Sequence, residues 1–374
     1  MNFFCSKEFC IPGIPERLDI NLPRVFLKLN KFQKDWLSEM NDMYSTALSH
    51  IKLQRFSEAL DYLHNYLSRL CGIINLNHEH KLEMNSEYIF CVEWQSAWEE
   101  KGNTHIITNI LIEKSMIIAT IGYLYLKIGT DEFSLGKFST ARDIYYKASS
   151  CFFYLNDCNE EISKGLHSPK SIENLPCECT TEFSIAFGEY CLAKYGSMRL
   201  CITISDEDNE KIKNLTSAEI SKKMVCAKIS SYVQNKFSKL LSFLDKTSDC
   251  MSNFKYLIMY QNESVKIIMY YNFILTINAL GTSIGDLDYL IKDIEISLLN
   301  LEVDIENFKE ILISQRDICK EARRYLSVLN GGDEENEGLL YEIPIINVLP
   351  DVPQAELKMN ENLKWFPYRP ESFL

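Results

Sequence analysis

Residues 138–155 have the sequence FSTARDIYYKASSCFFYL, and this stretch indicates the class of fold most clearly. Apolar side chains recur there at steps of three and four residues, at Phe138, Ala141, Tyr145, Ala148, Phe152 and Leu155. Such spacing is typical of one face of an α-helix, which completes a turn about every 3.6 residues. The stretch therefore predicts a long amphipathic helix that packs one face on a core.

Working outward, the same kind of spacing predicts helices along most of the chain. A second stripe consists of Phe56, Leu60, Leu63, Leu67 and Leu70. We expect helices over residues 35–70, 105–128, 131–155, 181–204, 217–244, 253–280 and 286–329. A capping box, Thr216 with Glu219, marks the start of the fifth of these. Loops are expected at 75–85 and 156–178, and an extended segment at 88–94.

The composition is that of a globular protein rich in helices. The 374 residues are 46% hydrophobic and 24% charged, with only 14 Gly and 10 Pro. A β-sandwich or barrel needs a turn about every 8–12 residues, usually written with such residues. The net charge of −13 argues against nucleic acid as a partner, because nucleic-acid affinity comes mostly from Lys and Arg.

The chain is expected to be a cytoplasmic protein. Its 13 cysteines show no CxxC spacing, which favours free thiols in a reducing compartment. The most apolar window, residues 115–126, is shorter than the roughly 20 residues of a membrane-spanning helix. We therefore expect no intrinsic membrane span.

One motif raises the alternative of an enzyme. Residues 281–285 match G-x-S-x-G, the nucleophile elbow of hydrolases, with Ser283 as the nucleophile. That fold needs a strand before the serine and a histidine after it. All six histidines precede Ser283, and residues 264–280 are expected to be helical. The helix-to-helix turn is thus the preferred interpretation, and we predict no enzyme, no cofactor and no metal site.

Four segments resemble the Bro-one domain family. Residues 88–98 are similar to its F-x-W-x-D segment, and 112–115 to its Y-E-K-S helix. Residues 138–155 resemble its A-x-x-F-x-x-A-A-G-x-F helix, and 348–358 its Pro-rich strap. The order and spacing of these segments agree with the family over about residues 35–360.

The resemblance implies an all-α, elongated, boomerang-shaped domain with a tetratricopeptide-like core and an extended C-terminal strap. It also implies a non-enzymatic adaptor of the ESCRT pathway. Members of the family bind the C-terminal amphipathic helix of an ESCRT-III subunit, charged multivesicular body protein four. A tetratricopeptide-like scaffold for another peptide is the alternative, and a hydrolase is a more distant one.

The domain organisation follows from the same resemblance. Residues 1–34 should be irregular because three prolines interrupt them, 35–360 form the domain, and 361–374 are a tail. Within the strap we expect 341–357 to be ordered against the helices. Since the chain ends Glu371-Ser372-Phe373-Leu374, no prenylated cysteine box and no lipid anchor are expected. We expect a monomer.

The partner-binding residues are predicted on the helix over 217–244. At about 100° per residue, Ile220 and Met224 fall opposite a face assigned to the core. That core face is Val225, Ile229, Tyr232, Leu240 and Phe243. The family's site uses two apolar residues four apart on this helix and one from the helix before it, which suggests Met198. Because the register can shift by one, Val225, Ser221 and Ser197 are the substitutes, and the predicted site is Met198, Ile220, Met224 and Val225.

Overall fold

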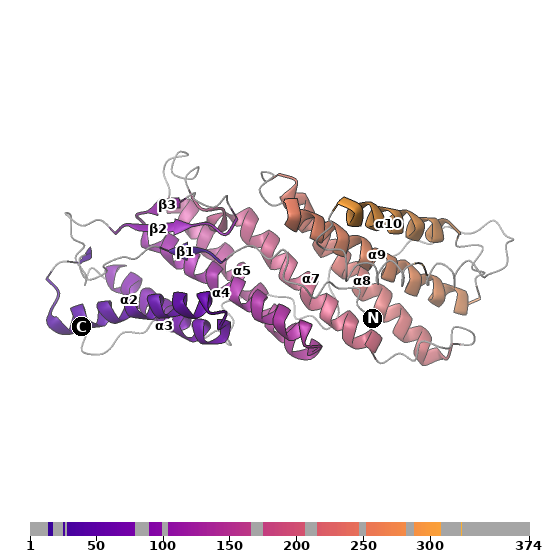
Figure 1. Cartoon of the computed structure of the whole chain (residues 1–374), viewed down its shortest axis with the longest axis horizontal. Helices are drawn as coiled ribbons and strands as arrows, with labels where there is room; N and C mark the ends of the chain where they lie inside the picture. Colours follow the sequence, from indigo (N-terminus) through magenta and orange to yellow (C-terminus); the bar gives the residue numbers. More distant parts are fainter. Residues whose placement is uncertain are drawn as a thin grey trace. The chain divides into compact units, whose positions relative to one another are not determined.

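The part of the chain that the structure describes is helical, with one small sheet (Figure 1). The computed structural model describes residues 14–17, 25–26, 28–78, 90–98, 104–165, 175–205, 215–246, 252–281 and 288–307, together with Arg323. The predicted strap at 341–357 and the tail at 361–374 lie outside these residues. The α-helices within them are α2 (Lys31–Lys52), α3 (Phe56–His78), α4 (Ile110–Ser134), α5 (Phe138–Gly165), α7 (Thr181–Ser205), α8 (Ser217–Leu244), α9 (Ser252–Ala279) and α10 (Asp288–Asn307).

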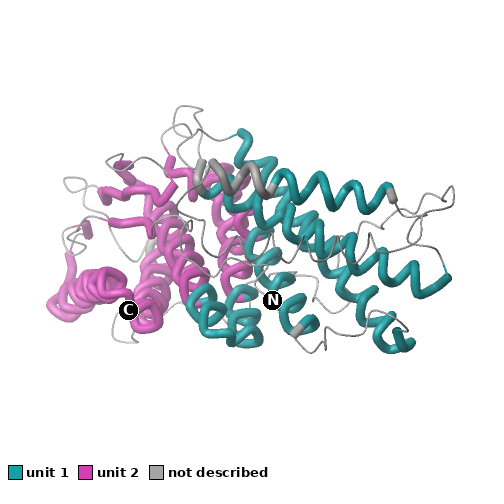
Figure 2. The backbone as a smooth tube through the Cα atoms, turned by 45° about the vertical axis from the view of Figure 1, so that its right-hand side comes forward, with its two compact units in different colours: residues 1–11, 129–146, 189–354 teal, residues 12–128, 147–188, 355–374 magenta. Residues whose placement is uncertain are grey.

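The described residues fall into two compact units, which Figure 2 colours separately. One unit takes its residues from 12–128 and 147–188, and therefore contains α2, α3 and the sheet. The other takes them from 129–146 and from 189 onward, and contains α8, α9 and α10. Helices α4, α5 and α7 contribute residues to both units.

Several helix boundaries differ from the prediction, and the stretch expected to be helical over 35–70 forms two helices, α2 and α3, that are separated at residues 53–55. Helix α2 begins at Lys31 rather than at residue 35, because Asn30 and Gln33 form a capping box that starts the helix earlier. Helix α4 continues through Gly129, where the sequence predicted an end. A Cβ at Gly129 would lie 2.8 Å from Tyr145 Cε1, so this glycine provides space for a ring. The turn comes later, at Gly136, whose φ of +74° suits glycine.

Two predicted loops are partly helical. Helix α3 continues to His78, into the stretch 75–85 that was predicted to be a loop. Helix α5 continues to Gly165 through a polar stretch, and buried residues on that stretch explain why. Ile162 is buried, and the buried Asn159 side-chain amide donates to the backbone oxygens of Glu178 and Thr180. Tertiary contacts of Asn159 and Ile162 thus stabilise the last turns of α5, although the polar sequence there does not predict a helix.

A three-stranded antiparallel sheet departs from the purely helical prediction. Its strands are β1 (Glu16–Arg17), β2 (Val92–Gln95) and β3 (Thr104–Ile107), in the order β1-β2-β3. Arg17 pairs with Trp94, and Val92 pairs with Ile107. The expected helix over 105–128 was therefore wrong at its start, where residues 105–107 belong to β3. Segment 88–94 is extended in its described part and leads into β2.

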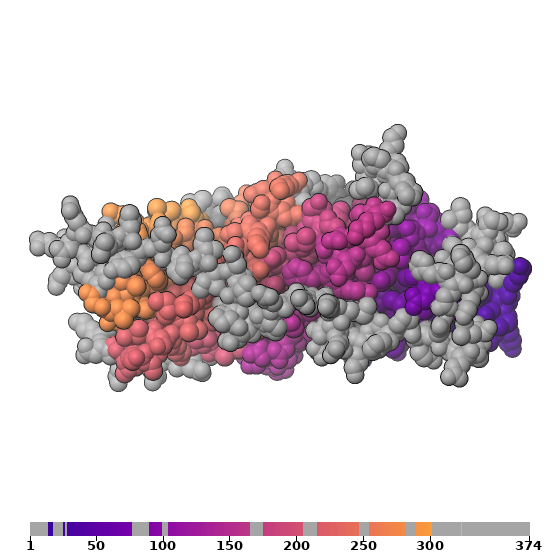
Figure 3. All heavy atoms as spheres, turned by 180° about the vertical axis from the view of Figure 1, so that it is seen from behind, coloured from indigo at the N-terminus to yellow at the C-terminus, as the bar shows by residue number. Residues whose placement is uncertain are grey.

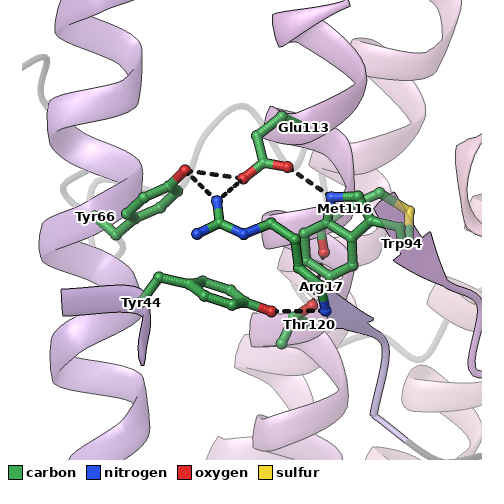
Figure 4. Close-up of polar contacts among 7 residues, drawn as sticks. All are labelled: Arg17, Tyr44, Tyr66, Trp94, Glu113, Met116 and Thr120. Atoms are coloured by element: carbon green, nitrogen blue, oxygen red, sulfur yellow. Dashed lines mark hydrogen bonds and ion pairs between the residues drawn. The ribbon is translucent and has the colours of Figure 1, made fainter. Parts of the chain in front are cut away.

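A buried polar cluster joins this sheet to three helices (Figure 4). The Arg17 guanidinium forms an ion pair of 2.5 Å with Glu113 and donates to the Tyr66 hydroxyl at 2.6 Å. Tyr66 and the Trp94 indole donate to the two Glu113 oxygens at 2.8 and 2.6 Å. The Arg17 guanidinium carbon also lies 3.7 Å from the centre of the Tyr44 ring. Residues from β1, β2, α2, α3 and α4 thus meet at one charge pair.

Burial makes this cluster structural rather than catalytic. The side chains of Arg17 and Glu113 are 1% and 0% exposed, so no substrate can reach them. Burial alone lowers the pKa of the Arg17 guanidinium, but attraction to Tyr66 and Glu113 outweighs that effect and the pKa is raised. Burial also raises the pKa of the Tyr66 phenol well above its ordinary value. The arginine therefore stays charged, and the phenol keeps the proton that it donates.

Candidate partner-binding surface

Helix α8 carries the candidate surface, and its start is fixed by the predicted capping box. The Thr216 hydroxyl accepts from the Glu219 amide at 3.3 Å, and the Thr216 amide donates to the Glu219 carboxylate at 2.6 Å. Helix α8 spans Ser217–Leu244, the range that the sequence predicted. The position of each side chain around the helix is therefore well defined at its N-terminal end.

Helices α7 and α8 pack against each other in antiparallel directions within one unit. Glu189 forms ion pairs with Lys236 and Lys239, while the backbone at Gly196, further along α7, meets Val233. A Cβ at Gly196 would lie 2.6 Å from Val233 Cγ2, so the glycine allows the close approach. Equal rise along both helices places the end of α7, Ser205, opposite residue 224 or so. The residues of α8 before about position 224 therefore lie beyond the end of α7, which does not cover them.

The exposed large apolar side chain of α8 is Val225, in its third turn. Val225 is 45% exposed, and Ile220 and Met224 are half-buried. Ser221, Met224, Val225 and Lys228 follow the i, i+3, i+4, i+7 spacing of one helix face. We call Ile220, Met224 and Val225 the apolar patch. Atoms of the segment that contains α8 reach the surface on the face drawn in Figure 3.

The predicted site therefore divides into a surface part and a buried part. Met198 is 0% exposed, and so is its substitute Ser197. The Ser197 hydroxyl donates to the Ala193 backbone oxygen on its own helix at 2.9 Å. The prediction of Met198 as a surface contact was wrong, because its side chain lies on a buried face of α7. Ile220, Met224 and Val225 share the N-terminal part of α8, and their role in binding stays a prediction.

The predicted core face of α8 also needs correction. Ile229, Tyr232 and Leu240 are buried as predicted, but Val225 is exposed and Phe243 is half-buried. A helical wheel assumes that the neighbouring helix covers the whole length. Helix α7 ends near Val225, so this residue has the angle of a core position without the cover.

Helix α8 is basic, a feature that its apolar spacing does not reveal. Its 28 residues contain five lysines and one acidic residue, Glu219, in a chain whose net charge is −13. Lys236 and Lys239 share the Glu189 carboxylate at 2.5 and 3.0 Å. Lys222 and Lys228 have no ion-pair partner among the residues that the structure describes. These two lysines flank the apolar patch.

The hydrolase alternative does not agree with the element before its motif. Gly281 follows the 28-residue helix α9 after a single turn residue, whereas a nucleophile elbow follows a strand. The described sheet is antiparallel and lies in the other unit. Ser283 itself lies outside the described residues. The helix-to-helix interpretation of this motif is therefore retained.

Neither a metal-binding cluster nor a membrane-spanning helix is found among the described residues. No group of three or more His, Cys, Asp or Glu side chains that could hold a metal ion occurs among them. None of the helices in this part of the chain combines the length and the apolar character needed to cross a bilayer.

Comparison with known proteins gives matches in structure alone. No family model and no curated protein matches the sequence. A Bro1 domain structure, solved as a basis for endosomal targeting, is 15% identical with a TM-score of 0.58, over 86% of this chain and 85% of that one. The ALIX Bro1 domain in complex with CHMP4C is 11% identical with a TM-score of 0.63, over 93% and 98%. ALIX in complex with the SIVmac239 late domain PYKEVTEDL is 11% identical with a TM-score of 0.59, over 93% of this chain and 50% of that one.

These likenesses show that the chain has the helical fold of Bro1 domains. They confirm the fold that the sequence resemblance implied, including its predominance of helix. At 11–15% identity they show the fold alone.

Proposed function

We propose that this protein is a non-enzymatic binding module of the ESCRT pathway. In this proposal it docks the C-terminal amphipathic helix of an ESCRT-III subunit of the CHMP4 type on the apolar patch of α8. Its place would be the cytoplasm, with recruitment to endosomal membranes through its partners. The observation that carries the proposal is the fold, which matches a CHMP4C-bound Bro1 domain over 93% of the chain.

The local geometry of α8 supports this assignment. A docked helix is held by a few apolar side chains spaced by three or four residues. Ile220 and Met224 have that spacing, and the exposed Val225 is adjacent to them. Isolated apolar residues on a surface are common, so the proposal rests on the adjacent pair Met224 and Val225, with Ile220 one turn before Met224.

The alternative is a helical scaffold that binds a different peptide. Helix pairs of the tetratricopeptide kind also present grooves to extended or helical ligands, and the helix starts at 55–59 and 137–141 resemble such pairs. The two interpretations differ in their ligand. A CHMP4-type helix should bind in the first case and fail to bind in the second.

The experiment is a titration of the full chain with a labelled peptide of the CHMP4C C-terminal helix. Val225→Asp and Met224→Asp each place a carboxylate where the apolar face of the peptide would lie. We expect each to weaken binding by about 2 kcal/mol, roughly thirtyfold. The melting curve should change little, because surface substitutions usually alter stability by less than about 0.5 kcal/mol.

Ile185→Asp is the matched control, because Ile185 is 46% exposed and lies on α7 in the other unit. It should leave binding unchanged. Normal binding by a folded Val225→Asp protein would exclude this site. A large decrease in the melting temperature of Met224→Asp would instead show that the Met224 side chain belongs to the core.

A further inference from the structure

Among the described residues, the lysines at the two ends of α8 differ in their ion pairs. At the C-terminal end, Lys236 and Lys239 are within 3.0 Å of the buried Glu189 carboxylate. At the N-terminal end, neither Lys222 nor Lys228 has an ion-pair partner within the described part of the chain. The lysines without an internal partner are therefore the ones beside the apolar patch.

The acidic residue closest to them in sequence is held in the capping box. Glu219 is the sole carboxylate of α8, and its oxygen accepts from the Thr216 amide at 2.6 Å and from the Thr216 hydroxyl at 2.7 Å. This capping box holds the carboxylate at the helix start, one turn or more from Lys228. Lys223 lies 5.9 Å from the centre of the Tyr271 ring, so its ammonium is directed toward α9.

Lys228 lies on the same helix face as the exposed part of the apolar patch. It is four residues after Met224 and three after Val225, so it lies on the same exposed face one turn further along. A helix whose apolar side chains cover Met224 and Val225 must pass this ammonium. Lys222 is half-buried and flanks the patch on another side.

We propose that the partner of this surface is an amphipathic helix whose apolar face is flanked by carboxylates, and that Lys228, assisted by Lys222, pairs with them. This inference rests on the proposed function and adds the charge of the ligand to it. Charge complementarity is the reason: in a chain with a net charge of −13, a locally basic face selects acidic partners and accelerates their association.

The test compares wild type with Lys228→Glu and Lys222→Glu in titrations at 50 and 500 mM NaCl. The probe is the CHMP4C C-terminal helix peptide, with a second version in which Asp and Glu are replaced by Asn and Gln. At 50 mM NaCl we expect Lys228→Glu to weaken binding about five- to tenfold, mainly through a slower association rate. At 500 mM the difference should shrink to about twofold or less, because salt screens exposed charges.

Two comparisons separate charge from structure. Lys34→Glu reverses an exposed lysine of α2 in the other unit and should leave binding unchanged. A peptide with one flanking carboxylate replaced by lysine should bind Lys228→Glu better than it binds wild type. A lysine with a merely structural role would not produce that rescue.

Each outcome decides one claim. If the amide-substituted peptide binds as tightly as the acidic one at 50 mM NaCl, the charge inference fails while the docking site stands. If wild type binds neither peptide, the proposed function and this inference fail together. If Lys228→Glu abolishes binding to vesicles containing phosphatidylserine but not to the acidic peptide, the basic face serves a membrane instead and the inference is overturned.

Discussion

Removing the Arg17 guanidinium tests whether the buried cluster holds the sheet on the helices. In Arg17→Met the side chain keeps a similar length but loses its charge. The Glu113 carboxylate would then retain two donors, the Tyr66 hydroxyl and the Trp94 indole, and no cation. Breaking a buried pair by removing one partner costs about 3–5 kcal/mol, because the other charge stays buried.

The cost should appear directly in urea unfolding. A free energy of unfolding of about 5–15 kcal/mol would lose a large fraction of its value. With an m-value of about 3 kcal/mol per molar urea, the midpoint should fall by about 1 M or more. The double variant Arg17→Met with Glu113→Gln should recover at least about 2 kcal/mol of the summed single effects, because it removes both charges together.

The neighbouring residue on β1 supplies the control. Glu16 pairs with Lys52 at 2.9 Å, but the two side chains are 43% and 62% exposed. Lys52→Met should therefore change stability by less than about 1 kcal/mol. The reasoning is refuted if Arg17→Met costs no more than Lys52→Met, or if the double variant is as unstable as the sum of the single ones.

Three further predictions concern the packing and the pH response. Gly196→Ala should cost about 1–3 kcal/mol, since its new methyl would lie 2.6 Å from Val233 Cγ2, and adding Val233→Ala should recover part of the loss in urea unfolding. Glu178→Gln should cost about 1–3 kcal/mol, because the buried carboxylate accepts from the Ser96 hydroxyl at 2.7 Å and the Ala97 amide at 2.8 Å; unchanged stability would contradict that role. Burial lowers the pKa of His64 from 6.5 to about 4, so the unfolded chain binds this proton more readily and stability should fall as the pH drops through that window, by up to about 1.4 kcal/mol per unit. The difference in slope between wild type and His64→Gln measures this effect, and equal slopes would refute it.

Helices with strong periodicity were predictable from the sequence. Helix α8 has the predicted bounds because its capping box and its apolar spacing agree. The end of α4 was predicted too early, at Gly129. In a sequence, a glycine that makes room for the Tyr145 ring cannot be distinguished from one that ends a helix. Strand β1 has two residues and carries no periodicity at all.

The helix that carries the candidate surface was predictable, but the exposure of its residues was not. The helix and two of its apolar residues came from spacing and from the family resemblance. The exposure of Val225 depends on where α7 ends relative to α8, and the burial of Met198 depends on which face of α7 is packed against its neighbours. The Arg17–Glu113 pair joins residues 96 positions apart, and no local pattern indicates it.

Photo-crosslinking tests the central claim most directly. A photo-reactive residue, p-benzoyl-phenylalanine, replaces Val225 in one protein and Ile185 in another, two positions that are 45% and 46% exposed and lie in different units. Each protein is irradiated with the CHMP4C C-terminal helix peptide. The account predicts a peptide adduct at position 225 that unlabelled peptide suppresses, and none at position 185. Equal adducts at both positions, or an adduct at 185 alone, would contradict docking on α8.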